Sequence, residues 1–132
     1  MTPEQAVLHL ILLRHAEFSG TVIPENPTGD QVVELYGELV ENDEHWEAMS
    51  DVREGEAETD IEATFSRHYE SKSVAAKTPE GRWVGWTYWY GGGKHGAPEE
   101  IEWLENAYFL DCKEEQKTVT VRTFTKSEEQ AA

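Results

Sequence analysis

The first half of the chain has the hydrophobic spacing of helices. Residues 6–13 are apolar apart from His9, and the four residues Thr2 to Gln5 supply a cap, a proline and the glutamine of a capping box. We therefore expect a largely buried helix that ends before Gly20. A strand over residues 8–13 is the competing interpretation.

Apolar residues spaced three and four positions apart between Val32 and Val40 predict a second, amphipathic helix of about three turns. Thr28 or Asp30 can cap its start. A third helix should follow and be broken by Gly55. Its expected cap is Asn42 or Asp43, and Trp46, Met49 and Val52 should lie on one side of it. Residues 60–65 are expected to form one more short helical turn.

The second half of the chain has the pattern of strands. Residues 68–77 and 82–90 are expected to form a hairpin around the turn Thr78-Pro79-Glu80-Gly81. After a glycine-rich loop, residues 98–100 should form a short helix or turn that directs Ile101, Trp103 and Leu104 inward. Because polar and apolar residues alternate over 118–125, we expect that segment to pair with 108–114 in a second hairpin.

These elements predict an α+β fold in which N-terminal helices pack on a C-terminal antiparallel sheet of about four strands. No linker or internal repeat divides the chain, so we expect residues 1–132 to form a single domain. Its parts would be an acidic helical region over 1–66, a sheet region over 67–126 and a polar tail over 127–132.

The charge of the chain is concentrated in one segment. The formal net charge is −16, and residues 25–62 contain fourteen acidic residues against one basic residue, Arg53, a net charge of −13. The other residues together carry −3. Such an excess of negative charge argues against direct binding to nucleic acid and against docking on an anionic membrane.

The acidic residues of the second helix follow one outward face without basic neighbours. None of Asp30, Glu34, Glu38 and Glu41 has a Lys or Arg three or four residues further on, so the usual helix-surface ion pairs are missing. Either the face is simply well solvated, or it is kept for a basic partner. In the second case the partner-binding residues are expected to be Asp30, Glu34, Glu38, Glu41, Asp43, Glu44 and Glu47.

This pattern favours a non-enzymatic interaction protein that docks on a basic protein surface. Two kinds of interaction protein are consistent with this charge pattern. One is a nucleic-acid mimic that inhibits its target, and the other is an immunity-type protein that plugs a basic active site. Four residues of helix rise about 6 Å, close to two base steps of about 3.4 Å along a DNA strand. Any acidic stripe of this spacing matches equally well.

An aromatic-rich strand supports an alternative function. Trp86, Tyr88, Trp89 and Tyr90 are the candidate residues of a small-ligand or peptide-binding site, because exposed rings stack on bases, bind cations or anchor partner proteins. The competing interpretation is that cross-strand aromatic pairs stabilise the sheet.

A third hypothesis, a hydrolase, rests on one short motif. Leu12-Leu13-Arg14-His15-Ala16-Glu17 resembles the Arg-His-Gly/Ala-Glu motif of the histidine phosphatase family. The resemblance implies that His15 is the phosphorylated nucleophile and Arg14 a phosphate clamp. That family places the motif at the end of a strand and needs a late histidine, for which His95 is the candidate here, whereas the cap at Thr2 predicts a helix.

The remaining composition predicts no cofactor, no metal site and no catalytic residues. The five histidines are scattered, and the single cysteine excludes an internal disulfide and a cysteine-rich zinc site. The absence of a long apolar run predicts no membrane span, and the lone cysteine suggests a reducing compartment, so we expect a cytoplasmic protein.

Overall fold

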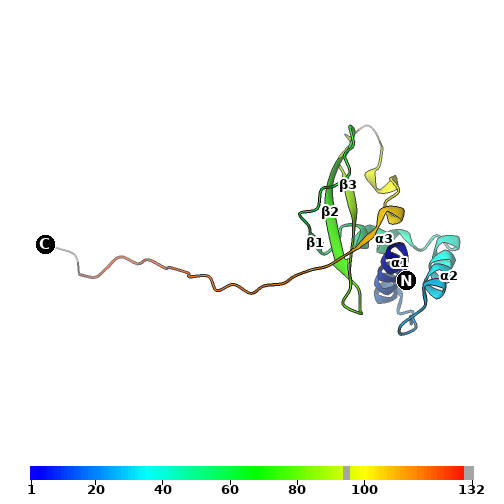
Figure 1. The fold of residues 1–132 in the computed structure, drawn as a ribbon, viewed down its shortest axis with the longest axis horizontal. Helices are drawn as coiled ribbons and strands as arrows, with labels where there is room; N and C mark the ends of the chain where they lie inside the picture. The colour runs from blue at the N-terminus through cyan, green and yellow to red at the C-terminus, as the bar shows by residue number, and fades with distance from the viewer. Residues whose placement is uncertain (94–95, 130–132) are drawn as a thin grey trace.

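The computed structural model describes residues 1–93 and 96–129, and it places three helices before a four-stranded antiparallel sheet (Figure 1). The expected α+β fold is therefore confirmed. No helix within these ranges combines the length and the apolar character that crossing a bilayer requires.

Capping boxes set the start of the first two helices. In α1 (Pro3–Ser19) the Gln5 amide donates to Thr2 Oγ1 at 3.1 Å, and the Thr2 amide donates back to Gln5 Oε1 at 2.9 Å. In α2 (Gly29–Glu41) Thr28 and Gln31 form the same pair of bonds. The helical interpretation of the first segment is thus confirmed and a strand over 8–13 is wrong. Thr28, not Asp30, caps α2.

The third helix, α3 (Trp46–Arg53), starts one turn later than its expected cap. Asn42 and Asp43 are wrong as its N-cap, because the amides of residues 42 to 44 close the end of α2 instead. The Asn42 amide donates to the Glu38 carbonyl at 3.1 Å and the Glu44 amide to the Leu39 carbonyl at 2.9 Å. The helical turn expected over 60–65 is also wrong: a short strand, β1 (Ala57–Glu58), is followed by irregular chain.

The sheet has the order β1-β2-β3-β4, and its central hairpin is the one expected. Strands β2 (Glu70–Lys77) and β3 (Trp83–Tyr90) pair along their whole length, and the Gly81 amide donates to the Thr78 carbonyl at 2.9 Å within the turn. Strand β4 (Tyr108–Leu110) then pairs with the first three residues of β3.

The second expected hairpin is wrong. Strand β4 ends at Leu110, and residues 111–129 contain no strand and are exposed throughout. Figure 1 shows this segment running away from the folded body. Residues 111–117 contain no Gly, Asn or Pro, and therefore no Asn-Gly or Asp-Gly pair of the kind that favours a tight hairpin turn, and the alternating segment 118–125 does not pair with β4.

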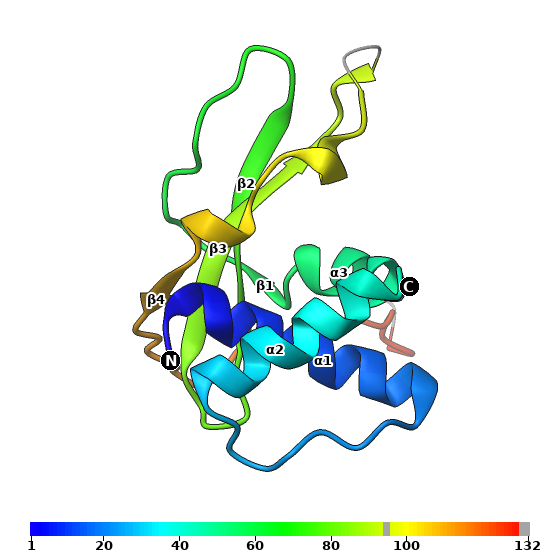
Figure 2. The same cartoon turned by 90° about the vertical axis from the view of Figure 1, so that its right-hand side faces the viewer.

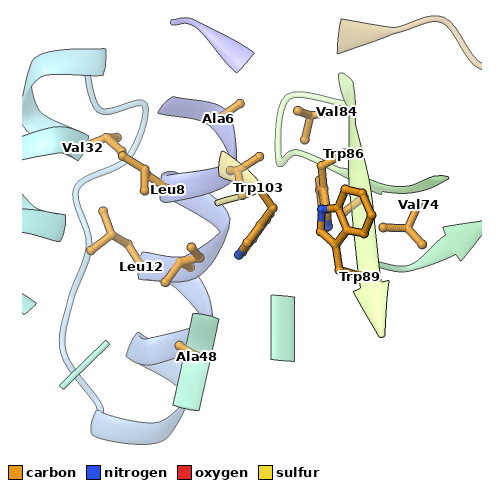
Figure 3. Packing of buried hydrophobic residues seen from close by; sticks show 13 residues of the cluster. Ala6, Leu8, Leu12, Val32, Ala48, Val74, Val84, Trp86, Trp89 and Trp103 are labelled. Atoms are coloured by element: carbon orange, nitrogen blue, oxygen red, sulfur yellow. The ribbon is translucent and has the colours of Figure 1, made fainter. Parts of the chain in front are cut away.

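The helices cover one face of the sheet, with α2 as the outermost element, packed on α1 (Figures 1 and 2). Between the 3₁₀ turns η2 (Pro98–Glu100) and η3 (Leu104–Asn106), Trp103 is directed inward as expected. Its ring centroid lies 5.4 Å from that of Trp86 on β3 (Figure 3). The core is made of residues from α1, α2, α3, the sheet and this turn region, and its largest fully buried members are Trp86, Ile11, Leu12, Val7, Val32, Val74 and Val84.

Arg53, the last residue of α3, joins the helices to β3. The Trp86 indole Nε1 donates to the Arg53 carbonyl at 2.8 Å, and Arg53 Nη1 donates to the Trp89 carbonyl at 2.7 Å. The guanidinium also lies over the Tyr88 ring, 4.7 Å from its centroid. Arg53 therefore supplies hydrogen-bond partners for the Trp86 indole and the Trp89 carbonyl where the helices meet the sheet. Its guanidinium adds a cation–π contact with Tyr88.

We predict that Arg53→Met lowers the free energy of unfolding by about 2 kcal/mol, because a charge-assisted hydrogen bond and a cation–π contact are both lost. Urea denaturation followed by tryptophan fluorescence measures this. Arg67→Met removes the same charge from an exposed position and is the matched control. Equal stability of the two variants would contradict the assigned role.

A second prediction concerns His9, which is buried on α1 at 4% exposure. Desolvation lowers the pKa of this imidazole below 6.5, although the charge of Glu80 opposes part of that shift. The unfolded chain therefore takes up a proton at higher pH than the folded one, and the contribution of neutral His9 to stability is lost as the pH falls below about 6.5.

His9→Gln removes the titrating group. Lowering the pH from 7.5 to 5.5 should therefore reduce the unfolding free energy of the wild type by more than it reduces that of His9→Gln. Denaturant titrations at four pH values give this difference directly. Parallel pH profiles for the two proteins would show that His9 is not responsible.

Candidate functional site

The exposed face of α2 carries four carboxylates at the spacing expected from the sequence. Asp30, Glu34, Glu38 and Glu41 are all exposed, while Val32 on the opposite side is fully buried. The burial of Val32 and the capping box at Thr28 hold the helix although its outward carboxylates repel one another.

Three further carboxylates lie where α2 gives way to α3. Asp43 has a positive φ of 56° that turns the chain, and its Oδ1 accepts a hydrogen bond from the Trp46 indole at 2.6 Å. Glu44 within this turn and Glu47 in the first turn of α3 are both exposed, and Glu44 Oε2 lies 3.9 Å from His15 Nε2. The structure thus places the seven expected residues in two groups, four along α2 and three at its end.

We call these seven residues the acidic surface. Within residues 1–93 and 96–129, none of the seven forms an ion pair with a Lys or Arg side chain. Two apolar side chains lie exposed on the same helix, Val33 at 47% and Val40 at 44%. The acidic surface therefore combines unneutralised negative charge with a small amount of apolar area.

At the end of α2, the acidic surface borders a cavity that the sequence did not indicate. The cavity has a volume of about 390 Å³ and is lined by residues from the end of α1 and from the α2–α3 turn: His15, Phe18, Ser19, Asp43, Glu44, Trp46 and Glu47. Trp46 is 51% exposed, and Phe18 is 46% exposed. Because α1 is distant in sequence from this turn, no local pattern brings the two together.

The aromatic candidate residues are not presented together. Trp86 and Trp89 are buried, at 0% and 8% exposure, whereas Tyr88 and Tyr90 are half-buried and stack at 5.6 Å between ring centroids. The Lys72 ammonium lies 5.6 Å and 5.8 Å from these two rings, and Arg53 lies over Tyr88. Cations of the protein itself thus already contact the accessible rings.

The residues of the phosphatase-like motif point to different places. The motif lies within α1 rather than at the end of a strand, and successive helical residues diverge by about 100°. Arg14 lines a groove beside α3, where its Nη1 contacts Glu17 at 2.9 Å and its Nε contacts Asp51 at 3.3 Å, while His15 lines the cavity beside Trp46. The hydrogen bond to Asp51, followed by the charge of Glu17, raises the pKa of Arg14.

No group of three or more potential metal ligands occurs among the described residues. His95, the candidate late histidine of the phosphatase-like arrangement, lies outside them. Comparisons of the chain with protein-family models, with curated proteins and with solved structures gave no significant match.

Proposed function

We propose that this protein is a non-enzymatic interaction protein whose acidic surface docks on a basic protein surface. The observation that carries the proposal is the exposure of all seven carboxylates together with the absence, in the part of the chain described, of any Lys or Arg that neutralises them. A surface of this kind steers a cationic partner and contributes charge-assisted contacts once the partner is bound.

Two modes of action fit this surface. A nucleic-acid mimic would place its carboxylates where phosphates bind in a basic groove, and an immunity-type protein would cover the basic active site of its target. The outermost position of α2 supports either mode, because the helix packs on α1 (Figure 2) and its four carboxylates are exposed.

The proposal is tested by charge reversal on α2. We predict that Glu34→Lys with Glu38→Lys weakens binding to the partner about tenfold or more, since like charges would then face each other across the interface. The wild-type protein is immobilised, exposed to host extract at low salt and eluted with a salt gradient, and the retained proteins are identified by mass spectrometry. The affinity of each purified candidate for both proteins is then measured.

The matched control reverses two carboxylates in the exposed C-terminal segment, Glu128→Lys with Glu129→Lys, which gives the same net charge of −12. This control should bind like the wild type. If the two double variants bind the partner with the same affinity, any difference from the wild type follows net charge alone. The acidic surface is then not the docking site.

A further inference from the structure

The cavity between α1 and the α2–α3 turn differs from the rest of the acidic surface in its chemistry. Two aromatic side chains, Phe18 and Trp46, are each about half exposed there, and three carboxylates surround them. Exposed aromatic side chains of this size are costly in water and are enriched where proteins anchor a partner.

The orientation of Trp46 is fixed from two sides. Its indole N–H is taken by Asp43, and the buried His45 ring lies against it with centroids 4.4 Å apart. The ring therefore loses little conformational entropy when it meets a ligand, which favours binding.

A cation of the chain itself already uses part of this aromatic surface. The guanidinium carbon of Arg14 lies 5.7 Å from the centroid of the Phe18 ring, within the range of a cation–π contact. Arg14 also pairs with Glu17 and Asp51, and none of these three residues lines the cavity.

From this geometry we infer that the cavity receives an arginine side chain of the basic partner. Its guanidinium is planar, stacks on aromatic rings and pairs with carboxylates through two parallel hydrogen bonds, which matches a cavity bounded by Trp46, Phe18 and the carboxylates of Asp43, Glu44 and Glu47. A lysine ammonium is more strongly hydrated and lacks the planar face. This inference rests on the proposed function and adds to it the position and chemistry of the anchor.

The test uses two fluorescently labelled peptides of equal charge, hexa-arginine and hexa-lysine, with binding followed by fluorescence anisotropy. The wild-type protein should bind hexa-arginine more tightly. Trp46→Leu keeps an apolar side chain but removes the ring, and it should weaken hexa-arginine binding by about 3- to 10-fold, the range expected for one cation–π contact. Hexa-lysine binding should change less than twofold.

Two controls separate the cavity from general charge. Phe124→Leu removes an equally exposed ring in the C-terminal segment and should leave both affinities unchanged. Glu34→Gln with Glu38→Gln lowers charge on α2 away from the cavity and should weaken both peptides alike. Circular dichroism spectra of all variants confirm that the helices are retained.

The outcomes distinguish the anchor from the proposed function. If Trp46→Leu leaves hexa-arginine affinity unchanged while the Glu34 and Glu38 variant weakens both peptides, the arginine anchor is wrong and the acidic surface still binds cations. If neither variant affects either peptide, both the anchor and the proposed function are contradicted. A selective loss of hexa-arginine binding in Trp46→Leu supports the anchor.

Discussion

The junction between Arg53 and β3 is the interaction on which the arrangement of the molecule depends. The end of α3 both accepts a hydrogen bond from the Trp86 indole and donates one to the Trp89 carbonyl, so helix and strand fix each other in position. Arg53 is also the one basic residue of the strongly acidic segment 25–62. Because the sheet uses this cation, the carboxylates of that segment have no counter-ion within it. The contact that joins the two layers thus occupies the one cation of this acidic segment.

Burial explains how α2 tolerates the resulting repulsion. Each pair of like charges four residues apart costs a few tenths of a kcal/mol, about 0.2–0.5. Burying one valine side chain contributes about 1.5–3 kcal/mol, and Val32 is fully buried while Leu35, Tyr36 and Leu39 pack against the same core. The inner face of α2 therefore outweighs the repulsion on its outer face. The helix is therefore stable with negative charge on its outer face, and the stability of the helix does not require that this charge be removed.

Local signals predicted more of this fold than long-range ones did. The capping box at Thr2 and the turn at Thr78–Gly81 are encoded within four residues and form as expected, and Thr28, one of the two expected caps of α2, forms a capping box as well. The segment 118–125 has equally strong strand character, but a strand needs a partner edge and a turn that brings it there. The charged residues 111–117 supply no such turn, so side-chain alternation alone was misleading.

The candidate site likewise combines features that local sequence determines with features that depend on long-range contacts. The positions of the four carboxylates on α2 follow from helical periodicity, which is local, whereas Asp43 and Glu44 lie in the turn after α2 and Glu47 lies in α3; all seven are exposed. The aromatic cavity depends on α1 ending beside the α2–α3 turn, a contact between segments far apart in the chain. That difference matters for specificity. Carboxylates spread along a helix attract any cationic surface at long range, whereas the proposed anchor on the Trp46 ring, which Asp43 holds, would select a side chain of one shape. In the proposed interaction, charge on α2 would attract the basic partner, and the Trp46 cavity would orient that partner once it is bound.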